Sequence, residues 1–151
     1  MKRITFFLIS LLFLAACSAP GPKATVERAF ESIKNQDAKA YIKFLPANEL
    51  AELEAIITDM KETPEYSADF LTYIGLSVTV EEIKNLTVES YLTLQLKSLS
   101  EAISSAEVSY GNETINGDEA TVQLIINGTT GDVDLIKENG KWVIIKGLDL
   151  N

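Results

Sequence analysis

The spacing of apolar residues changes from a helical to an alternating period at Ala106. The alternating apolar positions after that point are Val108, Tyr110, Ala120, Val122, Leu124 and Ile126. Asn-Gly turns at 116–117 and 139–140, and a loop through Asn127-Gly128 and Gly131, separate the alternating runs. Asn-Gly between alternating runs is a strong hairpin signal, because a tight hairpin turn needs residues that tolerate positive φ. The last third of the chain therefore predicts an antiparallel meander that ends in a strand through Trp142 to Ile145.

Before Ala106 the apolar residues follow a helical spacing. In the first such segment, Val26, Ala29, Phe30 and Ile33 form an i, i+3, i+4, i+7 stripe, which predicts an amphipathic helix. Asp37 is expected to cap a short second helix that ends before Pro46. Asn48 is expected to cap a third helix, which ends at Thr63-Pro64.

Three more helices are predicted between residues 68 and 103. One covers Ala68 to Ile74 and stops at Gly75, and another opens with a capping box at Thr79-x-x-Glu82. The segment after Thr87 is ambiguous, because three leucines alternate as in a strand. The helical stripe is longer, and leucine favours helix, so we predict helix. The stripe consists of Val88, Tyr91, Leu92, Leu96, Leu99 and Ile103.

Helices followed by a meander indicate an α+β domain. We expect N-terminal helices packed on the face of a C-terminal curved antiparallel sheet. Two segments together then resemble the nuclear-transport-factor-two-like superfamily, which has a cystatin-like, ketosteroid-isomerase-like cone. TVERAFESIKNQDAKAYIKFL (25–45) resembles its opening helices. GDEATVQLIINGTTGDVDLIKENGKWVII (117–145) resembles the closing hairpins of small bacterial lipoprotein domains of unknown function in that superfamily.

The resemblance is weaker for residues 61–103 and implies a fold rather than an activity. Ketosteroid isomerases and polyketide cyclases of similar fold use an acidic base in an apolar cavity. No motif of this chain matches their catalytic residues position for position, so none is carried over.

The first 16 residues have the composition of a secretory signal. Lys2 and Arg3 precede an apolar run that is shorter than the roughly 20 residues of a membrane-spanning helix. Leu14-Ala15-Ala16-Cys17 resembles the lipobox of bacterial lipoproteins, which implies cleavage after Ala16 and lipid attachment to Cys17. The alternative is a secreted protein whose free cysteine lies near its cleavage site by chance.

We therefore expect a signal peptide at 1–16, a lipidated tether at 17–23 and a single domain at 24–151. The lipid would hold the protein in the membrane of the cell envelope. Ser18 after the cysteine resembles the sorting pattern for the outer membrane, if the host has two membranes.

Composition excludes several classes of function. The leader carries two basic residues and no acidic one, so the mature chain keeps 11 basic and 22 acidic residues, a formal charge of −11. Such a chain repels nucleic acid, so no nucleic-acid partner is expected. The chain has no histidine, and its only cysteine is Cys17. Histidine-dependent catalysis and imidazole or thiolate metal sites are therefore excluded, and we expect no metal and no cofactor.

Six aromatic side chains are candidates for lining a cavity between the helices and the concave sheet: Phe30, Tyr41, Phe44, Tyr91, Tyr110 and Trp142. Aromatic residues often line apolar ligand pockets, but they also fill cores, and core packing is the alternative. Asp132 and Asp134 do not fit a calcium loop and are expected on the solvent face of a strand.

Two functions remain open. The first is a non-catalytic, membrane-tethered module that binds a small apolar ligand or an envelope protein. The second is a small isomerase or hydrolase that uses a carboxylate, such as Asp69 or Glu107, with a pKa raised by burial. A cone-shaped cavity filled by aromatic side chains, without a buried carboxylate, would favour the binding module. An open apolar pocket that holds an unpaired Asp or Glu would favour the enzyme. We expect no enzymatic activity.

Overall fold

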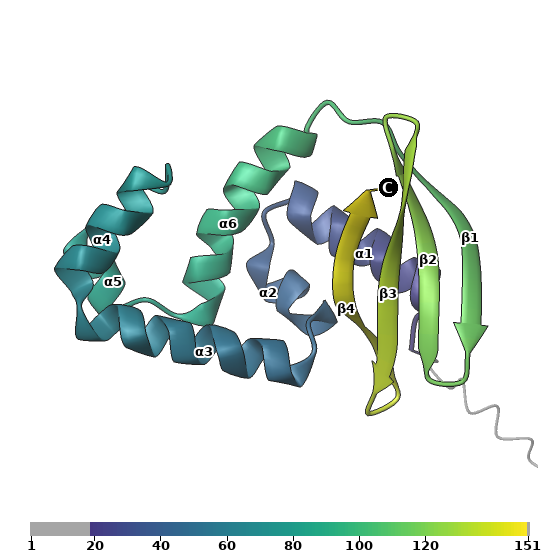
Figure 1. The fold of residues 1–151 in the computed structure, drawn as a ribbon, viewed down its shortest axis with the longest axis horizontal. Coiled ribbons are helices and arrows are strands. Elements are labelled where there is room, and N and C mark those ends of the chain that lie inside the picture. Colours follow the sequence, from purple (N-terminus) through teal and green to yellow (C-terminus); the bar gives the residue numbers. More distant parts are fainter. Residues whose placement is uncertain (1–18, 151) are drawn as a thin grey trace, which may run out of the picture.

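A computed structural model describes residues 19–150, apart from the side chains of residues 146 and 148–150. Within these residues, six α-helices and one 3-10 helix precede four strands (Figure 1). The helices are α1 (Pro22–Lys34), α2 (Ala38–Tyr41), the 3-10 helix η1 (Ile42–Phe44), α3 (Ala47–Glu62), α4 (Pro64–Tyr73), α5 (Val80–Lys84) and α6 (Val88–Ile103). The strands are β1 (Val108–Asn116), β2 (Glu119–Ile126), β3 (Thr129–Glu138) and β4 (Lys141–Leu150).

Three helix starts differ from the prediction, those of α1, α3 and α4. Helix α1 begins at Pro22, inside the segment expected to be tether, because the fixed φ of proline suits the first helical position. Asn48 does not cap α3. Pro46 is the N-cap in extended conformation, and its carbonyl accepts a hydrogen bond from the amide of Leu50 at 3.1 Å.

The other predicted helix signals are confirmed. Asp37 caps α2 by accepting from the amide of Ala40, and Thr79 and Glu82 form the capping box of α5. Helix α4 starts earlier than predicted, at Pro64, and ends before Gly75, which has φ of +92°. The ambiguous segment is helix α6, from Val88 to Ile103.

The strands form one antiparallel sheet in the order β1-β2-β3-β4. Asn127-Gly128 and Asn139-Gly140 form two-residue turns in which all four residues have positive φ, the pattern of type I′ hairpins. Two details of the prediction are wrong. The first turn is Gly117-Asp118, because Asn116 still pairs with Glu119. Gly131 is not in a loop but pairs with Leu124 inside the sheet.

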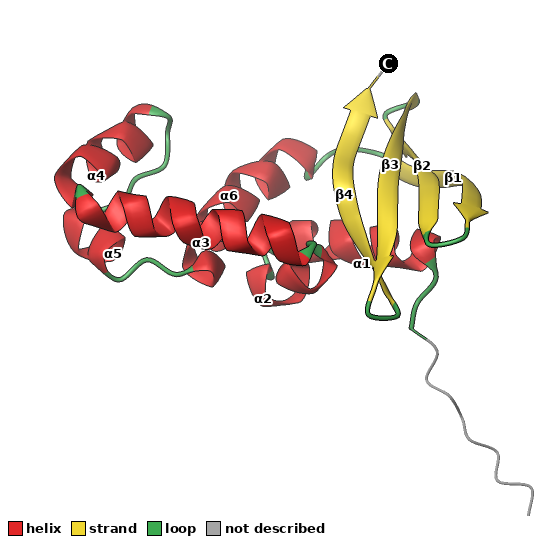
Figure 2. Ribbon diagram, turned by 60° about the horizontal axis from the view of Figure 1, so that its bottom comes forward, coloured by secondary structure: helices red, strands yellow, loops and turns green. Residues whose placement is uncertain are grey.

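The predicted α+β class is confirmed, although a single helix covers most of the sheet. Helix α1 lies across one face of the sheet and contacts β1, β2 and β4. The buried residues between them form the sheet cluster: Val26, Phe30, Ala120, Val122, Leu124, Val133, Leu135 and Trp142. Helices α3, α4 and α5 instead extend to one side of the sheet (Figures 1 and 2).

Two further clusters connect these helices to the rest of the molecule. The α3–α5 cluster buries Ile57, Ala68, Leu71, Val78, Ile83 and Leu86. The α2–α6 cluster buries Ala38, Leu45, Leu92 and Leu96. Helix α6 contributes to all three clusters, since Leu94 packs against the second and Ile103 against the sheet cluster.

Candidate functional site

A pocket of about 470 Å³ opens where α1, α2 and η1 meet the beginning of β4. Its volume lies within the roughly 300–1,000 Å³ that is typical of small-molecule sites. The pocket lies beside the sheet cluster, because Trp142 belongs to both. Pro20, just before α1, also lines it. The site therefore combines residues from both ends of the domain sequence.

Trp142 and Phe44 form the aromatic wall of the pocket. The tight turn at Asn139-Gly140 directs the chain into β4, where Trp142 is only 9% exposed. The ammonium group of Lys137 lies 5.6 Å from the centroid of the Trp142 ring, within the range of a cation–π contact. The Trp142 side of this wall is therefore held in place by both the sheet and the neighbouring cation.

Two buried hydroxyl groups of α1, those of Thr25 and Ser32, also line the pocket. Thr25 donates to the carbonyl of Gly21 at 3.0 Å, and Ser32 donates to the carbonyl of Arg28 at 2.8 Å. Their hydrogens are thus used by the backbone of the helix. The donors left for a ligand on this side are the neutral amide of Asn35 and the charged side chains.

Those charged groups are mainly basic. Arg28, Lys43 and Lys141 line the pocket together with the acidic residues Glu31 and Asp37. The carboxylate of Asp37 accepts from the amide of Ala40 at 2.9 Å and so caps α2. Three basic against two acidic side chains leave the lining with a small positive formal charge, in a mature chain with a formal charge of −11.

The six predicted aromatic residues do not come together around one cavity. Phe44 and Trp142 line the pocket, whereas Phe30 is buried in the sheet cluster with Tyr110 packed against its edge. Tyr41 packs against the α2–α6 cluster and Tyr91 against the α3–α5 cluster. Core packing therefore explains these four positions.

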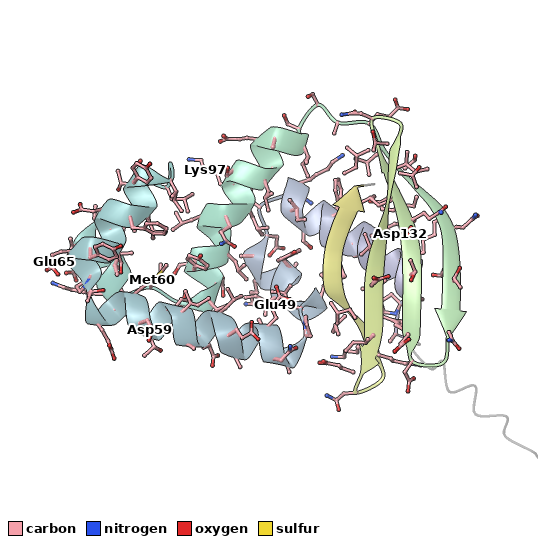
Figure 3. The ribbon with its side chains drawn as sticks, in the orientation of Figure 1. Glu49, Asp59, Met60, Glu65, Lys97 and Asp132 are labelled. Carbon is pink, nitrogen blue, oxygen red and sulfur yellow. The ribbon has the colours of Figure 1, made fainter. Side chains whose placement is uncertain are left out.

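Several titratable side chains near the clusters have shifted pKa values. Burial raises the pKa of Tyr41, and the nearby Glu49 carboxylate raises it further. Partial burial and the negative charge of Glu52 raise the pKa of Glu49 itself, which lies at the start of α3 (Figure 3). Burial also raises the pKa of Tyr110, with contributions from Glu27 and Glu31. Of the tyrosine and glutamate side chains named in this paragraph, only Glu31 lines the pocket.

The carboxylates considered for catalysis lie at the surface. Asp69 and Glu107 are both exposed, and no Asp or Glu in residues 19–145 belongs to the buried class. Asp132 is exposed on the sheet face turned away from α1 (Figure 3), as predicted. Asp134 is half-buried and accepts from the hydroxyl of Thr121 at 2.8 Å. Over the described part of the chain, no group of three His, Cys, Asp or Glu side chains is arranged to hold a metal ion.

The basic residues of the pocket were not predicted. Arg28 and Lys43 lie on the polar sides of the N-terminal helices, and Lys141 follows a hairpin turn. Solvent-exposed lysine and arginine residues commonly occupy positions of this kind, so none of the three positions indicated a binding site. The only indication in the sequence is that the mature chain has few basic residues. Three of them around one pocket are therefore noteworthy.

Comparison with known proteins identifies the leader. Residues 1–18 match the prokaryotic membrane lipoprotein lipid attachment site, so the protein is a lipid-anchored prokaryotic membrane lipoprotein, attached through the lipobox cysteine Cys17. Of the helices in residues 19–150, none has the length and apolar character needed to span a bilayer. Cleavage after Ala16 stays a prediction, because that bond lies outside the described residues.

In fold, the chain is similar to a crystal structure from Campylobacter jejuni of a protein provisionally described as an NTF2-like transpeptidase. The TM-score is 0.46 and the sequence identity 13%, over 85% of this chain and 100% of the other. No curated protein matches the sequence.

Proposed function

We propose that this membrane lipoprotein is a non-catalytic binding module whose pocket at Trp142 binds a small anionic amphiphile. The observation that carries the proposal is the placement of Arg28, Lys43 and Lys141 around an aromatic wall. Trp142 and Phe44 would contact the apolar part of the ligand. The basic side chains would bind its anionic group, a carboxylate or a phosphate.

Electrostatics favours an anion at this place over a purely apolar ligand. A chain of net charge −11 repels anions in general, so binding an anion requires a local concentration of cations. Arginine binds carboxylate and phosphate groups through two parallel hydrogen bonds. Since the hydrogens of Thr25 and Ser32 are already donated to the backbone, the cations and the Asn35 amide are the groups left to recognise the anion.

The pocket also lies close to the lipid anchor along the chain. Pro20, which lines the pocket, follows Cys17 by three residues. An extended chain spans at most about 3.6 Å per residue, so Cys17 is within roughly 11 Å of Pro20. Both a lipid headgroup and a soluble amphiphile from the envelope are within reach of a pocket at this position. If the host has two membranes, we propose the outer membrane as its location, on the basis of Ser18.

The exposure of the carboxylates supports the non-catalytic assignment. A general base of the cone type needs a carboxylate with a pKa raised by an apolar environment, and Asp69 and Glu107 are solvated. Glu31, which does line the pocket, is also exposed. A carboxylate-dependent isomerase or hydrolase remains the alternative proposal, and turnover that is lost in Glu31→Gln would support it.

Fluorescence of Trp142 gives a direct test, because it is the only tryptophan in the chain. The lipidated protein in phosphatidylcholine nanodiscs would be titrated with hexyl phosphate, hexanol or inorganic phosphate. We expect saturable binding of hexyl phosphate, at least about tenfold tighter than either fragment, because a charge-assisted hydrogen bond contributes about 1.5–3 kcal/mol. Hexanol binding as tightly as hexyl phosphate would refute an anionic ligand.

Matched variants assign the binding to the pocket. Lys43→Gln should weaken hexyl phosphate about tenfold, whereas Lys39→Gln, an exposed cation outside the pocket, should not. Equal effects of both variants would contradict the assignment. Phosphatidylglycerol in the nanodisc should compete with hexyl phosphate if the natural ligand is a lipid headgroup, and should have no effect if it is soluble.

A further inference from the structure

Helix α4 carries exposed aromatic side chains on one face. Tyr66, Phe70 and Tyr73 are 72%, 47% and 88% exposed. Their i, i+4, i+7 spacing places them on one side of the helix. The opposite side of α4 is already buried, since Ala68 and Leu71 belong to the α3–α5 cluster. A helix that is apolar on both sides needs a partner for the second side.

The aromatic stripe borders a groove between α3 and α4. A pocket of about 260 Å³ lies there, and α3 contributes Ile56, which is exposed, and Met60, which is half-buried. Tyr66 and Phe70 form the opposite wall. Figure 3 labels Asp59 and Met60 on α3 and Glu65 on α4. The groove, defined by Ile56, Asp59, Met60, Thr63, Tyr66, Ser67 and Phe70, is a surface that a helix can occupy.

The segment that carries this groove is acidic, and its Asp59 lines the groove directly. Between residues 59 and 69 the chain has four acidic residues and one basic residue, all exposed: Asp59, Glu62, Glu65, Asp69 and Lys61. An anionic membrane surface is therefore repelled. A second copy of this chain would bring the same acidic edges together, which is unfavourable as well. Charge complementarity selects a partner whose apolar residues are flanked by lysine or arginine.

The position of the groove in the molecule allows such a partner to bind while the pocket is occupied. Helices α4 and α5 lie at the end of the molecule opposite the sheet (Figures 1 and 2). The described chain begins at the sheet end, where the amide of Lys23 donates to the carboxylate of Glu113 at 2.7 Å. The groove is therefore at the end far from the first described residues, which follow the lipidated cysteine.

We propose that the α3–α4 groove is a docking site for an amphipathic helix of another envelope protein, with apolar side chains flanked by basic residues. This site is separate from the pocket at Trp142 and does not depend on the ligand proposed there. The aromatic side chains supply the buried centre of the interface, where Tyr and Phe contribute most. The acidic side chains would orient the basic partner helix and raise its rate of association.

Photocrosslinking in cells that make the lipidated protein tests the site. The photoreactive residue p-benzoylphenylalanine would replace Tyr73, which is exposed, in the full chain. We expect one crosslinked protein, and mass spectrometry should locate the crosslink in a helical segment with lysine or arginine beside apolar residues. No adduct, an adduct with lipid, an adduct with a second copy of the chain, or a crosslinked segment without basic residues would overturn the proposal.

Charge reversal distinguishes docking from chance proximity. Asp59→Lys combined with Glu65→Lys should lower the crosslink yield about tenfold, because like charges at the edge oppose association. The matched control, Glu101→Lys combined with Glu119→Lys, changes the net charge equally on exposed positions outside the groove and should leave the yield unchanged. An equal loss of crosslink yield in both double variants would refute the docking site. Circular dichroism of each variant checks that the fold is retained, and hexyl phosphate binding reports separately on the pocket.

Discussion

At the scale of single residues, Gly111 sets the shape of the exposed edge of the sheet. The register of β1 against β2 shifts between Tyr110 and Glu113, which marks a bulge. The ammonium group of Lys23, at the start of α1, donates to the carbonyls of Tyr110 and Gly111 at 3.1 and 3.3 Å. The bulge therefore turns backbone oxygens toward α1 and fastens the first helix to the sheet edge.

We expect Gly111→Ala to destabilise the protein by about 1–3 kcal/mol, as overpacking does elsewhere. The added Cβ would lie 2.9 Å from Oε1 and 3.0 Å from Cβ of Gln123. The amide group of Gln123 can rotate away, but its Cβ cannot. Chemical denaturation measures the loss. Gly147→Ala is the control, because its Cβ would meet nothing within 4 Å, and an equal loss there would contradict the steric explanation.

At the scale of elements, α6 joins the three hydrophobic clusters. Leu92 and Leu96 face α2 and η1, while Leu94 packs on the α3–α5 cluster. The alternation that suggested a strand arises because both sides of this helix are covered. Its start is fixed by Thr87, whose hydroxyl accepts from the amide of Ser90 at 3.1 Å, while the Ser90 hydroxyl accepts from the amide of Thr87 at 2.8 Å.

Thr87→Ala should lower the free energy of unfolding by about 1 kcal/mol, because it removes the N-cap acceptor of α6. Thermal or urea denaturation of the variant and the parent protein gives the difference. Thr93→Ala serves as the control on the same helix. Its exposed hydroxyl bonds only to the carbonyl of Glu89, and alanine is the better helix former, so its stability should be unchanged or slightly higher. If Thr87→Ala leaves the free energy of unfolding unchanged, tertiary packing alone fixes the start of α6.

At the scale of the whole molecule, lipidation determines where both proposed sites work. Pro20 follows Cys17 by three residues, so we expect the pocket to lie close to the bilayer, while α4 lies at the other end of the described part of the molecule (Figure 2). Two or three acyl chains hold a protein to the membrane with negligible release, at roughly 0.8 kcal/mol per buried methylene. A ligand of the pocket and a partner of the groove would thus be bound by one molecule at the membrane.

We expect Cys17→Ala to give an unlipidated precursor that keeps residues 1–16, because the thiol is the only lipid acceptor at the lipobox. Labelling with radioactive or alkyne-tagged fatty acid, followed by gel electrophoresis, measures this. Ser18→Ala is the control and should still be labelled. Uptake of label by Cys17→Ala would contradict attachment at Cys17.

Most of the fold was predictable because its signals are local. Turn chemistry at Asn139-Gly140, the capping box at Thr79 and the stripe of α1 each depend on residues a few positions apart. The errors are local as well: Asn48 is a good capping residue, but Pro46 before it takes that position. The site was less predictable, since four of the six chosen aromatic residues pack in hydrophobic clusters away from the pocket.

The lipid anchor and the α+β class could be inferred from the amino-acid sequence alone, as could the lack of histidine chemistry, because each depends on composition or on short-range spacing. The shared pocket of Arg28, Lys43 and Lys141, and the exposure of Tyr66, Phe70 and Tyr73, became known only from the folded chain. A cation on a polar face or an aromatic residue on a helical stripe has the same local signature wherever it ends up, and long-range packing selects which faces are covered.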